Sequence, residues 1–63
     1  MTKEEVKRLR KELGMTQRQL ARALDVTLAS VGRWEIGIHQ IEEHTALLLK
    51  LLVQMKKDTQ RNK

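Results

Sequence analysis

The chain has 63 residues, enough for one small domain near the lower size limit for folding on its own hydrophobic core. It contains no cysteine, which excludes disulfides. Its 13 Lys and Arg against 8 Asp and Glu give a formal net charge of +5, which favours a polyanionic partner, either nucleic acid or an acidic membrane surface. The longest apolar run, residues 46–49, cannot span a bilayer, and no signal-peptide pattern is present, so we expect a soluble cytoplasmic protein.

The first predicted helix covers residues 3–13. Thr2 and Glu5 have the spacing of a capping box, which satisfies two backbone N–H groups at a helix start. Apolar residues then recur at helical spacing, and Gly14 supplies a stop. These apolar residues are Val6, Leu9 and Leu13. Arg10 falls on the same face, so it needs a partner inside the protein.

Two short helices are predicted next, over residues 17–24 and 28–36. Thr16 and Gln19 form a second capping-box pattern, and Thr27 is a favourable N-cap for the following helix. About three residues join the two helices. This geometry holds a second helix out from the body for insertion into a DNA major groove, although an ordinary helical hairpin has the same spacing.

The helix over residues 28–36 has two different faces. Val31, Trp34 and Glu35 share one of them, so we assign Trp34 to the core rather than to stacking on DNA. The opposite face carries Ala29, Gly32, Arg33 and Ile36. The glycine costs the helix about 1 kcal/mol relative to alanine. Small residues around one arginine favour close approach to a flat partner.

The longest helix is predicted over residues 42–57, followed by a flexible basic tail over 58–63. Its core-facing stripe is predicted to consist of Leu47, Leu48, Leu51, Leu52 and Met55. A second apolar strip is formed by Ala46, Leu49 and Val53. Because a monomer would leave that strip in water, we expect it to form a homodimer interface. The alternative is that the strip packs against the first helix.

Several motifs together resemble one family. The segments are Met15-Thr-Gln-Arg-Gln-Leu-Ala21, Leu24-Asp-Val-Thr27 and Val31-Gly-Arg-Trp-Glu35, closing at Gly37. In this combination they resemble the helix-turn-helix of the phage-repressor and Cro superfamily (XRE-like proteins). The resemblance covers roughly residues 4–37. It implies an all-α, compact four-helix, lambda-repressor-like domain over residues 1–57, with the helix-turn-helix at 17–36 and a longer C-terminal helix. Asp25 stands where the family usually has glycine in the turn.

The resemblance also implies roles for individual residues. Arg33 would read guanine in the major groove, because a guanidinium matches its two acceptors. Gln17 would donate to a DNA phosphate, whereas Ser30 contacts either a phosphate or nothing. Arg10 and Glu35 would pair in a buried salt bridge. The predicted DNA-binding residues are Gln17, Arg18, Thr27, Leu28, Ala29, Ser30, Gly32, Arg33, His39 and Gln40.

The predicted function is that of a sequence-specific transcriptional repressor, bacterial or phage-encoded, that binds a palindromic operator in double-stranded DNA as a homodimer. The alternative is an antitoxin that autoregulates its operon and binds a toxin. An enzyme is poorly supported, because no nucleophile–histidine set or phosphate-binding glycine loop is present. No cofactor or membrane partner is expected. The group His39, Glu42, Glu43 and His44 matches no zinc-ligand spacing, so no metal site is predicted.

Overall fold

The described residues, 1–61, form four helices and no strand in the computed structural model of the chain, with side chains described through Thr59. The helices are α1 (Lys3–Glu12), α2 (Gln17–Leu24), α3 (Leu28–Ile36) and α4 (Glu43–Arg61). The all-α architecture with a longer last helix is therefore confirmed. The bounds of α2 and α3 agree with the predicted ranges, and α1 ends one residue before its predicted end.

The helix starts are fixed by side-chain caps. Thr2 accepts a hydrogen bond from the backbone N–H of Glu5, whose carboxylate accepts in return from the N–H of Thr2. Thr16 and Gln19 repeat this capping box at the start of α2. Thr27 caps α3 by accepting from the N–H of Ser30. Each cap satisfies donors that the first turn of a helix leaves without partners.

Left-handed backbone conformations end α2 and α3. Asp25 has φ 58° and ψ 46°, a conformation that aspartate tolerates better than most residues. Gly37 has φ 86°, and its N–H bonds back to the last turn of α3. Asp25 therefore makes the turn between α2 and α3 without the glycine that the family usually has there.

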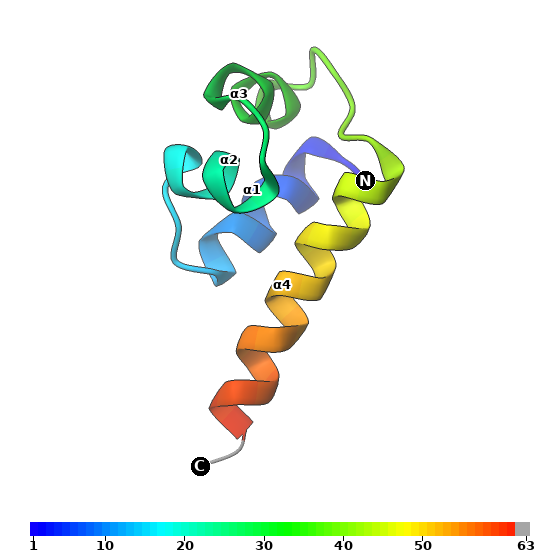
Figure 1. The fold of residues 1–63 in the computed structure, drawn as a ribbon. Helices are drawn as coiled ribbons and strands as arrows, with labels where there is room; N and C mark the ends of the chain where they lie inside the picture. Colours follow the sequence, from blue (N-terminus) through cyan, green and yellow to red (C-terminus); the bar gives the residue numbers. More distant parts are fainter. Residues whose placement is uncertain (62–63) are drawn as a thin grey trace.

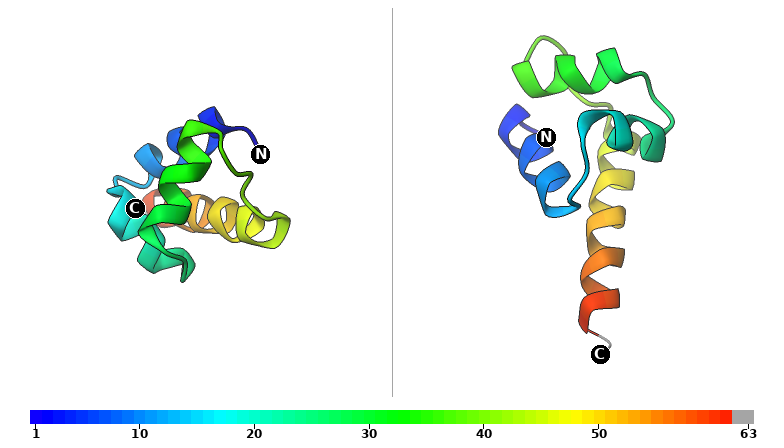
Figure 2. Two further views of the ribbon diagram at one scale, coloured as in Figure 1. Left: turned by 90° about the horizontal axis from the view of Figure 1, so that it is seen from above. Right: turned by 90° about the vertical axis from the view of Figure 1, so that its left-hand side faces the viewer.

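The first three helices form a body at one end of the molecule (Figure 1). α3 lies across the end of this body, while α4 starts near that end and runs past α1 to the far end, as the two further views also show (Figure 2). The Cα trace extends over 39 × 19 × 18 Å. The outer surface of α3 and the free end of α4 therefore lie at opposite ends.

All four helices contribute to one hydrophobic core. Leu20, Leu49, Val6 and Val31 are the largest fully buried side chains. Trp34 is 8% exposed and belongs to this core, which confirms its predicted assignment. Ile41, in the loop before α4, is also buried and fastens that loop to the body.

The predicted orientation of α4 is wrong. Ala46, Leu49 and Val53, assigned to a dimer interface, are buried within the single chain at 8%, 0% and 6% exposure. They pack against the body formed by α1 and α2, the alternative that the sequence left open. The predicted core stripe instead faces outward. Its exposed members are Leu47, Leu48, Leu51 and Met55, and Leu52 is partly buried.

The last helix also runs further than predicted. It continues to Arg61, so residues 58–61 of the expected flexible tail are helical, and residues 62 and 63 lie outside the described part. Gln54 donates to the carboxylate of Asp58, and the Thr59 hydroxyl donates to the Met55 carbonyl. With neither proline nor glycine in this segment, these local bonds allow the helix to continue.

Candidate nucleic-acid interface

A bidentate ion pair joins α1 to α3. Arg10 Nε lies 2.6 Å from Glu35 Oε2, and Arg10 Nη2 donates to Glu35 Oε1 at 3.1 Å. The two side chains are only 14% and 3% exposed. Arg10 also donates to the Met15 carbonyl, so one guanidinium fixes α1, the following loop and α3. The predicted salt bridge is present, and it sets how α3 sits on the body.

Hydrogen bonding controls the charge state of this pair. Burial raises the pKa of Glu35, but the hydrogen bonds from Arg10 and Gln17 outweigh it and hold that pKa below its ordinary value. The hydrogen bond to Glu35 raises the pKa of Arg10 against the opposing effect of burial. Both side chains are therefore charged at neutral pH, and the pair is permanent under ordinary conditions.

Gln17 lies beside this ion pair at the start of α2. Its side-chain amide donates to Glu35 Oε1 at 3.1 Å, a contact that the sequence did not predict. A primary amide has two N–H donors, so Gln17 can hold Glu35 with one and offer the other to an external acceptor. The ion pair thereby orients a polar group at the helix N-terminus, where the backbone also favours anions.

The outward face of α3 is not covered by other described parts of the chain. Ala29, Arg33 and Ile36 are all exposed and follow one another at spacings of four and three residues, which places them on one side of the helix. Ile36 is 63% exposed, unusual for so large an apolar side chain. Ile36 was not among the predicted contact residues, although its position on the same face as Arg33 was visible in the sequence.

Gly32 lies beside this face and has no packing reason to be glycine. A Cβ built at Gly32 would meet no described atom within 4 Å, and its φ is not in the left-handed region. The body of the protein therefore leaves room for a larger residue. Contacts within the described part of the chain therefore do not explain the glycine at this position.

The hydroxyl groups at the leading end of α3 are already engaged. Thr27 Oγ1 and Ser30 Oγ lie 2.9 Å apart, and Thr27 also accepts from the Ser30 N–H. Leu28, next to them, is 41% exposed. Within α3, all nine residues of which are described, the long charged donor on the outer side is therefore Arg33.

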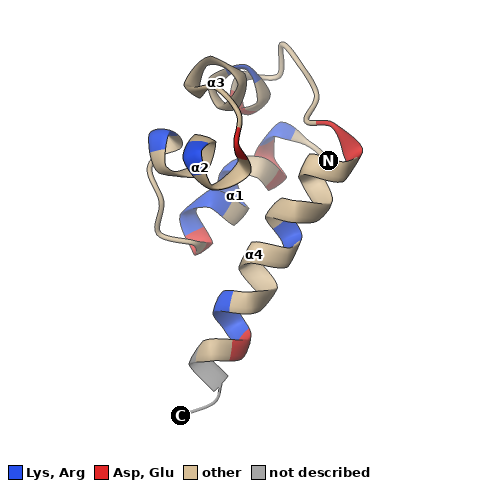
Figure 3. Ribbon diagram, in the orientation of Figure 1, with Lys and Arg blue, Asp and Glu red and all other residues tan. Residues whose placement is uncertain are grey.

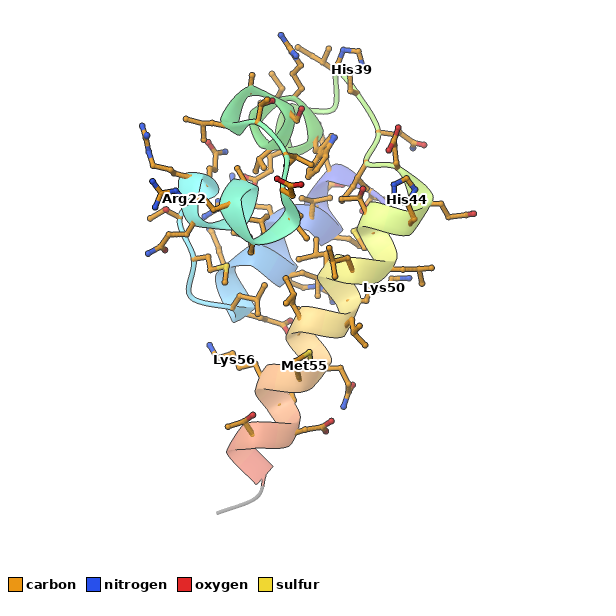
Figure 4. All side chains as sticks on the ribbon, in the orientation of Figure 1. Arg22, His39, His44, Lys50, Met55 and Lys56 are labelled. Carbon is orange, nitrogen blue, oxygen red and sulfur yellow. The ribbon has the colours of Figure 1, made fainter. Side chains whose placement is uncertain are left out.

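Basic residues occur on all three helices of the body. Figure 3 shows Lys and Arg positions on α1, α2 and α3, with acidic positions on α1, at the α2–α3 turn and at the start of α4. Arg18 and Arg22 are exposed one turn apart on α2, and Arg22 points away from the body (Figure 4). The sequence prediction included Arg18 but missed Arg22, which the four-residue spacing could have revealed.

The loop after α3 brings His39 to the same end of the molecule (Figure 4). His39 and Gln40 are both exposed there. His44 lies further along at the start of α4, where its Nε2 is 3.5 Å from Glu42 Oε1, and both side chains are mostly exposed. Among the described residues, no group of three ligating side chains is arranged to hold a metal ion.

A comparison with protein families identifies this architecture. A family model described as helix-turn-helix matches residues 6–50, which are 45 of the 63 residues. The chain belongs to the helix-turn-helix family. No curated protein and no solved structure matches it. The match supports the Cro and phage-repressor type, whose members are DNA-binding transcription regulators rather than enzymes.

The family match spans most of α1, all of α2 and α3 and the first part of α4, so it includes the exposed outward face of α3 described above. In a helix-turn-helix, the second helix of the motif enters the major groove while the first crosses the DNA backbone. Here α3 is that second helix and α2 is the first. Within residues 1–61, no helix has the length and apolar character needed to cross a membrane.

Proposed function

We propose that this helix-turn-helix protein is a sequence-specific transcriptional repressor that binds a palindromic operator as a homodimer. The observation that supports base reading is the outward face of α3, where Arg33 is exposed among small and apolar residues. A guanidinium pairs with the two major-groove acceptors of guanine. Repression follows if the operator overlaps a promoter of a bacterial or phage gene in the bacterial cytoplasm.

Phosphate contacts complete the proposed interface. The second amide N–H of Gln17, the N-terminus of α2 and the Arg18 side chain would hold one strand. His39 and Gln40, exposed in the loop after α3, would contact the backbone on the other side. These contacts position the protein without reading sequence. Binding should therefore weaken steeply as salt concentration rises, because bound counterions are released from DNA.

The outer strip of α4 is the proposed dimer interface in place of the buried residues first assigned to it. The strip consists of Leu47, Leu48, Leu51 and Met55, which are 38–62% exposed. Three of these, at positions 48, 51 and 55, have the alternating spacing of a two-helix seam. Contiguous exposed apolar surface of this kind usually marks an interface.

The fold favours one arrangement of that dimer. α4 runs away from the end of the molecule that carries α3 (Figures 1 and 2). A two-fold axis parallel to α4 would therefore turn both α3 faces toward the same side. Each chain is 18–19 Å across. The two α3 helices would therefore have to lie near the outer edges of the pair to reach the roughly 34 Å between the centres of half-sites one DNA turn apart.

Replacing Arg33 with alanine tests base reading. An operator is first obtained by selection from random duplexes and by footprinting upstream of this protein's own gene. Arg33→Ala should then reduce the preference for operator over random DNA by about 5- to 150-fold per half-site, because one bidentate contact contributes about 1–3 kcal/mol. Affinities measured by fluorescence anisotropy at fixed salt give the ratio. Unfolding by urea checks that the fold is intact.

Arg18→Ala is the matched control, since it removes the same side chain from an exposed position assigned to a phosphate contact. It should weaken binding to operator and random DNA alike, as loss of a phosphate contact does. An Arg33→Ala protein that discriminates as well as the original chain would show that α3 does not read bases through this residue.

Gly32→Ala separates stability from binding. The substitution should raise the free energy of unfolding by about 1 kcal/mol, because alanine is the better helix former and the space for its methyl group is open. The same methyl group should weaken operator binding, because it holds α3 away from the bases. Urea unfolding and operator titration measure the two effects. Stronger operator binding by this variant would contradict close approach at Gly32.

A further inference from the structure

The large apolar side chains that are exposed in the described part of the chain fall into two groups. Four of them form the outer strip of α4. The others lie on or next to α3: Leu28, Ile36 and Ile38, at 41%, 63% and 65% exposure. The proposed dimer accounts for the first group. The second group lies on α3 and directly after it, not on α4, and needs a different explanation.

Ile36 has the clearest position in this second group. It follows Arg33 by three residues and Ala29 by seven, so it lies on the same outward face of α3. From Ala29 to Ile36 the helix rises about 10 Å, close to the roughly 12 Å width of a B-DNA major groove. Ile38 follows the left-handed Gly37 and lies beyond the end of the helix.

The chemistry of the major groove offers an apolar side chain one specific partner. Base edges there present hydrogen-bond donors and acceptors, except for the C5 methyl group of thymine. An isoleucine can form no hydrogen bond, so next to G·C edges it covers polar groups without pairing them, which costs free energy. Next to a thymine methyl group, both surfaces leave water.

We propose that Ile36 is a specificity residue that reads the C5 methyl group of a thymine in each operator half-site, next to the guanine contacted by Arg33. The inference rests on the proposed function and adds the base chemistry that α3 recognises. The methyl group itself is the ligand. A cytosine carrying a C5 methyl group should therefore partly replace the thymine, whereas uracil should not.

The test is a double-mutant cycle: one change removes the Ile36 side chain from the protein, and the other removes the thymine methyl group from the DNA. Each thymine of the selected operator is replaced in turn by deoxyuridine, in both half-sites together. Affinities are measured for the original chain, Ile36→Ala and Ile38→Ala. Ile38 is the matched control because it is the same residue type with nearly the same exposure, two residues away.

For the original chain, deoxyuridine at one thymine position should weaken binding about fourfold per half-site, the effect of losing one buried methyl group. Ile36→Ala should bind the thymine and deoxyuridine operators equally, because its partner side chain is gone. Ile38→Ala should retain the full penalty. Since Ile36 is exposed and alanine favours helix, Ile36→Ala should remain folded.

Three results would overturn the inference: no deoxyuridine position weakens binding, Ile36→Ala keeps the full penalty, or the penalty disappears in Ile38→Ala instead. Unchanged operator affinity of Ile36→Ala would also overturn it and would leave the side chain available to a protein partner. Failure of the proposed function would give a different result. The original chain would then bind all duplex sequences with similar affinity, and Arg33→Ala would not change the preference for operator over random DNA.

Discussion

Replacing Glu35 with alanine is expected to lower the free energy of unfolding by about 3–5 kcal/mol, because the Arg10 guanidinium would remain in the interior without its carboxylate. Glu35 is 3% exposed and accepts from both Arg10 and Gln17. A domain of this size is stabilised by about 3–5 kcal/mol in total. The variant should therefore be largely unfolded. Urea titration followed by the fluorescence of Trp34, the one tryptophan of the chain, measures the loss.

The control replaces both partners with apolar residues. Arg10→Met together with Glu35→Leu should recover most of the lost stability, because no buried charge is left unpaired. This comparison separates the cost of an orphaned charge from the net contribution of the pair, which is small. A loss below about 1 kcal/mol for Glu35→Ala would show that water reaches Arg10 and that the pair does not hold α1 to α3.

Acid should weaken the same contact. The pKa of Glu35 is lower in the folded chain than its ordinary value of about 4.5. The carboxylate therefore contributes its full stabilisation above that value, and the contribution is lost as the pH falls through the folded pKa. As the pH falls below about 4.5, the original chain should lose more stability than the double variant. Equal acid sensitivity would contradict the lowered pKa.

Local signals made the first three helices predictable. Thr2, Thr16 and Thr27 each satisfy donors within their own first turn, so the helix starts depend on residues a few positions apart. The faces of α3 followed from its periodicity, because only one side of that helix is apolar enough to be core. The ion pair was anticipated from an inward-facing arginine and the family resemblance.

The faces of α4 could not be chosen in this way. The helix has two apolar strips, and periodicity alone does not say which one meets the body. Its rotation is set by the loop that leads into it, where Ile41 is buried, and by small residues on the packed side. Ala46 and Thr45, both 8% exposed, bring the helix close to the body. Leucines occur in both strips, since Leu49 is buried whereas Leu51 is exposed, so residue type could not assign the core face either.

The role proposed for Ile36 was not predicted from the sequence for a different reason. The predicted contact residues were mainly polar groups and small residues at the leading end of α3, as the family resemblance suggested. Only its 63% exposure shows that this side chain is not covered by the following loop. The contact of Gln17 with Glu35 could not be predicted from the sequence either. It joins residues 18 positions apart and depends on how α2 packs against α3.

Two glutamate substitutions only two residues apart, on opposite faces of α4, should have opposite consequences. Leu49 is fully buried, so Leu49→Glu places an unpaired carboxylate in the core and should unfold the chain. Leu51 is 56% exposed, so Leu51→Glu should leave the fold and the melting temperature nearly unchanged. It should, however, separate the proposed dimer, because a two-fold axis along α4 sets the two new carboxylates opposite each other.

Circular dichroism measures the fold of each variant, and sedimentation equilibrium with and without operator measures pairing. Lys50→Gln is the matched control, since it lowers the net charge by the same one unit at an exposed position next to Leu51. This control should still pair on the operator. The outer strip of α4 has four exposed apolar residues, compared with roughly 20–30 residues per partner in a standard stable interface, so pairing should be weak in free protein and complete on DNA. If Leu51→Glu still occupied both half-sites with the original affinity, the strip would not be the interface. A folded Leu49→Glu protein would contradict the observed rotation of α4.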